Sequence, residues 1–220
     1  MGEAIGEILA LGIGVALSPL AIIAVVLMLA APHGRSSAVA FLAAWVLALA
    51  AVGTAALLVA DIADADSGGA ATWVAIVKGV IGVLLLGVAA RQLRGRKDGA
   101  EDELPGWMSQ LDGITPARSA GLAVLFAAVK PKNLLLSVAA GAAVAQTGAA
   151  PAGQAVALGV FVLLGALAPG VPVGIHALMR ERGPAILAAT REWMLRENDT
   201  IIAVLCLVLG LKLLGDAVAS

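Results

Sequence analysis

The stretch SAGLAVLFAAVKPKNLLLSVAAGAAVA, from Ser119 to Ala145, decides the fold class, because it is apolar almost throughout and yet carries KPKN (130–133) in its middle. It exceeds the roughly 20 apolar residues that cross a bilayer as a helix. Proline lacks the backbone N–H that continues a helix, and lysines inside apolar segments are costly. We therefore expect a transmembrane helix that is broken near its middle.

Five further apolar stretches accompany this one in a chain of 220 residues that is 61% hydrophobic and 13% charged. Soluble domains are roughly 45–50% apolar and about 25% charged, so the membrane is the expected solvent. The six expected spans cover residues 5–31, 37–60, 72–90, 117–145, 154–179 and 200–218. The sequence predicts an all-α integral membrane domain of six transmembrane helices, with no separate soluble domain.

The basic residues of the expected loops predict the orientation. They follow the first, third and fifth spans: Arg35, Arg91, Arg94, Arg96, Lys97, Arg118, Arg180, Arg182, Arg191 and Arg196. Positively charged loops stay in the cytoplasm, so both termini are expected outside. Residues 1–90 and 117–220 then form two three-helix repeats of opposite orientation, an inverted repeat, joined by a cytoplasmic loop at 91–116.

The first and fourth spans share a central proline, at Ser18-Pro19 and Lys130-Pro131. Interrupted spans at matching positions of inverted halves point to a substrate site. No acidic residue is expected at the depth of Lys130 and Lys132, so an anionic substrate would balance their charge. We predict substrate binding by Lys130, Pro131, Lys132 and Asn133, framed by Ser18 and Pro19. Two alternatives remain: residues 117–129 form a re-entrant or interfacial piece, or a lysine carries a coupling proton.

Other polar or helix-breaking residues have weaker signals. Pro169, Gly170 and Pro172 predict a hinge or a static kink in the fifth span. Glu7 and Lys78 could pair in the outer leaflet, and with His176 they are candidates for coupling. Lys212 and Asp216 have the spacing of an ion pair on one helix face. The polar segment 180–199 predicts a short interfacial helix, and the aspartates at 61, 64 and 66 predict a solvated loop.

Several functions are disfavoured by the sequence. It contains no Ser/His/Asp, HExxH or phosphate-loop pattern, so we expect neither an enzyme nor a metal site, and no cofactor. The RGRK stretch at 94–97 is a topology signal, and nucleic-acid binding has no support. The lone Cys206 argues against a thiol-redox membrane protein.

Three stretches together resemble a known superfamily: SPLAIIAVVLMLAAPHGR (18–35), FLAAW (41–45) and KPKNLLLSVAAGAAVA (130–145). They are similar to the lysine exporter superfamily, and most similar to its peptidoglycolipid-addressing branch, also called sulfolipid-1-addressing proteins. The resemblance implies export, because the superfamily moves amino acids, small metabolites and ions outward. The addressing branch is implicated in delivering large glycolipids to the surface of actinobacteria. Other branches usually have asparagine where Lys130 stands, which implies a different substrate.

The expected protein is therefore a multi-pass exporter or flippase in the bacterial inner membrane, moving an anionic lipid or glycolipid toward the cell surface. Proton coupling is expected, because no ATP-binding motif is present. One alternative is an exporter of a small polar metabolite, amino acid or ion. Another is a non-transporting accessory of a larger lipid-export machinery. Membrane lipids are the expected partners, and a homodimer fits transporters of this size.

Overall fold

The computed structural model describes residues 2–31, 34–67, 70–94, 113–179 and 182–219, and within these ranges the regular structure is helical. The elements are α1 (Gly2–Ala16), α2 (Pro19–Ala30), α3 (Gly34–Ser67), α4 (Ala70–Arg94), α5 (Pro116–Val124), the π-helical turn η2 (Leu125–Val129), α6 (Pro131–Ala145), α7 (Pro151–Gly165), α8 (Leu167–Leu178) and α9 (Gly183–Ala219). The expected all-α class is confirmed.

Two single helices and three bent pairs have the length and hydropathy of membrane spans. The single spans are Gly34–Ile62 of α3 and Asp199–Val218 of α9. The pairs bend by 44° between α1 and α2, by 63° between η2 and α6, and by 57° between α7 and α8. If each pair is one span, the described residues hold five. The other expected span, α4, is a continuous helix whose described apolar part, Gly79–Gln92, is shorter than a span.

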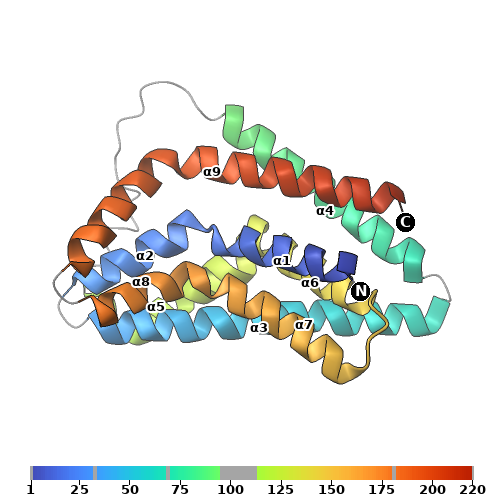
Figure 1. The fold of residues 1–220 in the computed structure, drawn as a ribbon, viewed down its shortest axis with the longest axis horizontal. Helices are drawn as coiled ribbons and strands as arrows, with labels where there is room; N and C mark the ends of the chain where they lie inside the picture. Colours follow the sequence, from blue (N-terminus) through green and yellow to red (C-terminus); the bar gives the residue numbers. More distant parts are fainter. Residues whose placement is uncertain (1, 32–33, 68–69, 95–112, 180–181, 220) are drawn as a thin grey trace.

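Glycines allow the helices to approach at two crossings. Figure 1 shows α4 and α9 next to each other along one side of the molecule. A Cβ built on Gly82 of α4 would lie 3.0 Å from the Gly210 carbonyl oxygen of α9, and one on Gly210 would lie 3.1 Å from that of Gly82. On the other side, a Cβ on Gly141 of α6 would lie 2.5 Å from the Gly53 carbonyl oxygen of α3. Such backbone contact is typical of membrane helices.

The buried apolar side chains form a main core and a small second cluster at Ile23 and Met194, and many other large apolar side chains lie on the outer surface. Trp45 and Phe41 of α3 are fully buried, and their rings stack with centroids 5.9 Å apart. On the outside, Leu47 and Leu163 are 69% and 71% exposed. Large apolar side chains left open on this scale suit a protein surrounded by lipid.

Two expectations about polar segments are wrong, because the helices continue through them. Helix α3 runs to Ser67, so the expected acidic loop at 61–66 is helical. The expected interfacial helix at 180–199 is not separate, because α9 is one helix of 37 residues from Gly183. The Glu192–Arg196 ion pair, with its oxygen and nitrogen 3.1 Å apart, supports the helix through this polar part. Figure 1 shows the first turns of α9 inclined to the rest.

The ends of the helices fall into two groups. In Figure 1 the ends of α2 and α8 and the starts of α3 and α9 gather at one end of the molecule. The start of α1 and the end of α9 lie toward the other end. Of the expected cytoplasmic loop at 91–116, residues 91–94 belong to α4 and 95–112 lie outside the described residues. Basic residues lie at this end of the molecule: Arg35 is in the first turn of α3, and Arg182 directly precedes α9.

Candidate substrate site at two helix breaks

The first break separates α1 from α2 at Leu17 and Ser18. Pro19 is the first residue of α2, where a missing N–H costs nothing because helix starts leave their N–H groups free. The Ser18 carbonyl oxygen accepts from the backbone N–H groups of Ala21 and Ile22, at 3.1 and 3.2 Å. The last carbonyl groups of α1 have no following turn to bond them, so they need another donor.

The second break follows a π-helical turn. The Lys130 N–H donates to the Leu125 carbonyl oxygen five residues earlier, at 3.1 Å. The next residue in this pattern would donate to Phe126, but it is Pro131 and has no N–H. The Asn133 side chain replaces that donor: its Nδ2 lies 2.9 Å from the Phe126 carbonyl oxygen. The chain then continues as α6 at an angle of 63°.

Side chains of the second break also bond the first break. Lys132 Nζ donates to the carbonyl oxygens of Gly14 and Leu17, at 2.7 and 3.1 Å. Asn133 Nδ2 lies 3.3 Å from Ser18 Oγ. Lys132 is only 8% exposed. These two bonds place its ammonium at the carboxyl end of α1, where the helix dipole favours a positive charge. The structure thus brings the two predicted breaks together.

This arrangement corrects the expectation that Lys132 lacks a partner inside the protein. Its partners are two backbone carbonyl groups, which a count of acidic residues in the sequence does not include. Carbonyl oxygens at a broken helix accept hydrogen bonds from a cation as a hydration shell would. Lys132 therefore ties the two breaks together, and an anion is not needed to bury it.

Lys130 lies in a different setting from Lys132. It is half-buried, and its Nζ lies 4.9 Å from the centroid of the Phe126 ring. A cation over an aromatic ring is attracted to it but keeps its N–H donors open to further acceptors. No carboxylate among the described residues bonds to Lys130. Of the two lysines, Lys130 is the one whose ammonium has no hydrogen-bond acceptor among the described residues.

A small buried polar cluster surrounds the contact between the breaks. Ser18, Lys132, Asn133 and Ser137 are all buried, and Ser137 Oγ donates to the Asn133 carbonyl oxygen at 2.9 Å. Asn133 Oδ1 is buried and has no donor among the described residues. An unsatisfied buried acceptor is uncommon and indicates either strain or a missing donor. This oxygen is therefore an open acceptor at the centre of the site.

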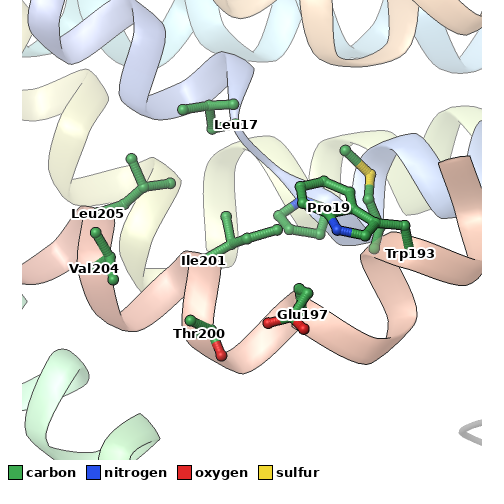
Figure 2. A pocket seen from close by; sticks show the side chains of 9 residues that line it. Leu17, Pro19, Trp193, Glu197, Thr200, Ile201, Val204 and Leu205 are labelled. Atoms are coloured by element: carbon green, nitrogen blue, oxygen red, sulfur yellow. The ribbon is translucent and has the colours of Figure 1, made fainter.

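An apolar cavity of about 420 Å³ borders the first break. Leu17 and Pro19 form one wall, and the other residues lining it come from α9: Trp193, Met194, Glu197, Thr200, Ile201, Val204 and Leu205. Figure 2 shows Trp193 and Ile201 near Pro19, with Glu197 and Thr200 on the same stretch of α9. Leu17 belongs to both features, because its side chain lines the cavity and its carbonyl oxygen binds Lys132.

The predicted break in the fifth span lies earlier than its prolines. The chain bends at Ala166, while Pro169, Gly170 and Pro172 lie inside α8. Pro169 cannot donate to the Gly165 carbonyl oxygen four residues before it. The Trp45 indole of α3 replaces that donor, with Nε1 3.1 Å from the oxygen. Trp45 is not among the predicted site residues, because a tryptophan in an apolar stretch such as FLAAW does not indicate a hydrogen bond to another helix. Whether this bend acts as a hinge stays a prediction.

The candidates for coupling are spread over the molecule. His176 lines a separate cavity near the end of α8. Glu7 and Lys78 belong to α1 and α4, but their side chains lie outside the described residues. The expected Lys212–Asp216 pair is present, with Nζ and Oδ2 2.6 Å apart. Among the described residues, no group of three His, Cys, Asp or Glu could hold a metal ion.

Comparison with known proteins identifies the family. The model of the family described as "Sap, sulfolipid-1-addressing protein" matches residues 8–219, almost the whole chain. No curated protein and no solved structure matches this chain. The match agrees with the resemblance carried by the stretches at 18–35 and 130–145. This chain belongs to the sulfolipid-1-addressing protein family.

Proposed function

We propose that the protein exports an anionic lipid or glycolipid across the bacterial inner membrane, past the two helix breaks. The family suggests a role in lipid export or addressing. The apolar helices suit a membrane protein. The cavity beside the first break carries the proposal, because it places an apolar space next to Leu17, whose carbonyl oxygen binds the Lys132 ammonium.

The cavity suits an amphiphile. Its walls are apolar apart from Glu197 and Thr200, and it lies between α9 and the first break. A lipid tail could occupy such a space at little cost, since both the lining and the surrounding bilayer are apolar. A sealed aqueous vestibule would instead suit a small polar metabolite. The cavity therefore favours the lipid over the metabolite alternative.

The two lysines have different roles in this proposal. Lys130 receives the anionic head group, because its N–H donors remain available beside the Phe126 ring. Lys132 holds the breaks together through the carbonyl oxygens of Gly14 and Leu17. Movement of α1 and its carboxyl end relative to α6 must break these bonds, so the ammonium acts as a latch on the transport path.

We further propose six spans arranged as inverted halves, with both termini outside. Two contacts support this arrangement. The two helix breaks contact each other through Ser18 and Asn133, and Gly82 of α4 and Gly210 of α9 each lie against the other's carbonyl oxygen. Equivalent elements of two inverted repeats are expected to meet in this way about a central axis. The end of the molecule where α2, α3, α8 and α9 gather would then face the cytoplasm.

The test compares lipids at the cell surface and in the inner membrane, by mass spectrometry, in cells lacking the gene. These cells carry no protein, the wild type, Lys130→Gln, or Arg196→Gln as a control for loss of a positive charge. Arg196 suits this purpose because its side chain is 67% exposed and neither lines the cavity beside the first break nor takes part in the contact between the breaks. We expect an anionic lipid to accumulate inside without the protein and with Lys130→Gln, but not with Arg196→Gln.

Two results would redirect the proposal. Unchanged lipids in cells without the protein would exclude lipid export and favour a small metabolite. Accumulation without the protein, together with full rescue by Lys130→Gln, would exclude this lysine as the head-group site. That second result would favour the accessory role in a larger lipid-export machinery.

A further inference from the structure

A second cavity lies on the far side of the contact between α2 and α9. Ile23 of α2 packs in a buried cluster with Met194 of α9, which lines the first cavity, and Ile23 lies along α2 between the residues that line the two cavities. The second cavity, of about 340 Å³, is bounded by the last turns of α2, the end of α8 and the first turns of α9. Figure 1 shows these three helix ends together.

The lining of this cavity combines an apolar wall with two nitrogen-bearing side chains. Val26, Leu27 and Leu187 belong to the apolar wall, and His176 and Arg191 supply the polar groups. No carboxylate among the described residues lines it. A buried or half-buried cation in apolar surroundings normally has an anionic partner. Here none of the described residues lining the cavity supplies that partner.

Arg191 provides the second observation. Its Nε is shielded from the surface and has no hydrogen-bond acceptor among the described residues. Buried donors without acceptors are uncommon, and a guanidinium commonly binds the oxygens of a carboxylate or phosphate in pairs. His176, in the last turn of α8, adds a ring N–H donor to the same cavity. Both groups suit a tetrahedral oxyanion beside an apolar chain.

We propose that this cavity binds the phosphate head group of an anionic membrane phospholipid, with part of an acyl chain along the α2 wall. Basic pockets between membrane helices bind such head groups. A volume of about 340 Å³ is in the range of small ligand sites, which start at roughly 300 Å³. The site is separate from the exported lipid's path, and its occupancy does not depend on transport.

The test uses purified full-length protein in a neutral detergent, with phosphatidylglycerol and phosphatidylcholine of equal chain length as probes. Native mass spectrometry counts the lipid retained per protein molecule. We expect wild type to retain phosphatidylglycerol in preference to phosphatidylcholine. Loss of a charge-assisted hydrogen bond in Arg191→Gln should weaken retention about tenfold, and His176→Gln should weaken it less. Arg196→Gln, on the exposed face of the same helix, should retain lipid as wild type does.

A second pair of variants keeps Arg191 in place. Ala188 and Ala189 are both exposed, but only Ala188 lines the cavity. Ala188→Trp should fill the space and abolish retention, whereas Ala189→Trp should not. Equal retention of both phospholipids, or wild-type retention by both Arg191→Gln and Ala188→Trp, would overturn the proposal. Complete competition by millimolar inorganic phosphate would also overturn it, because the site would then bind the free anion. Failure of the export experiment would leave these results unaffected.

Discussion

At both helix breaks a proline starts a new helix, but one break supplies hydrogen-bond acceptors and the other supplies donors. The break at Ser18-Pro19 has no ionisable side chain and presents carbonyl oxygens, those of Gly14 and Leu17. The break at Lys130-Pro131 carries the donors: Lys132 bonds these two oxygens, and Asn133 Nδ2 donates to Ser18 Oγ. One half of the molecule therefore accepts and the other donates. Lys132 and Asn133 therefore hold the two breaks together, whereas the N–H donors of Lys130 remain available to a ligand.

The largest expected effect comes from removing the latch. Lys132→Met leaves two carbonyl groups buried without a donor, which should lower the free energy of unfolding by about 3 kcal/mol. For a chain of this size the Tm should fall by about 6–12 °C. Thermal unfolding of purified protein in detergent measures this change.

Lys130→Met is the matched variant for that measurement, since it removes the same charge two residues away, on the other side of Pro131. An unchanged or raised Tm for Lys132→Met would contradict the latch. It would mean that burying the ammonium costs more than its two hydrogen bonds return, as happens for some buried charges.

The next effect concerns the amide that serves both breaks. Asn133→Leu removes the donor to Phe126 and to Ser18, and we expect a loss of about 2 kcal/mol. Ser18→Ala removes only the longer bond, of 3.3 Å, and should cost about 0.5 kcal/mol. Chemical unfolding compares the two variants. Equal losses would show that the Phe126 carbonyl does not depend on Asn133.

The sequence predicted the breaks because proline has a fixed backbone effect that no packing removes. Ser18-Pro19 and Lys130-Pro131 start new helices in the structure. It did not predict the partners of Lys132, because every residue has a backbone carbonyl group and the sequence does not show which of them a helix break leaves without a donor. It also did not predict that α3 continues through residues 61–66 or that α9 begins before its span, since single charges on a helix do not end it. Proline locates a lost hydrogen bond, but only the fold shows which side chain replaces it.

The third bend tests whether that rule extends beyond the site. Trp45→Phe keeps an aromatic ring but removes the indole donor to the Gly165 carbonyl oxygen. We expect a loss of about 1.5 kcal/mol, from the hydrogen bond and a small cavity. Trp193→Phe, at an exposed position on α9, is the control and should unfold like wild type. Equal stability of both variants would show that the bend does not need Trp45.

The smallest expected effect on stability belongs to Lys130. Lys130→Gln loses an attraction to the Phe126 ring worth about 0.5 kcal/mol at a partly exposed site. Its Tm should therefore stay within about 2 °C of wild type. A loss as large as that of Lys132→Met would mean that both lysines are structural, and the comparison between them would fail.

The cavity beside the first break allows the central claim to be tested without touching either lysine. Val204 and Val208 lie one turn apart on α9 and are 53% and 58% exposed, but only Val204 lines the cavity. The measurement is the surface content of the accumulating lipid, in cells without the gene that carry Val204→Trp or Val208→Trp at equal abundance in the membrane. We predict that Val204→Trp fails to restore the lipid to the surface and that Val208→Trp restores it. Full restoration by Val204→Trp would contradict a lipid path through this cavity.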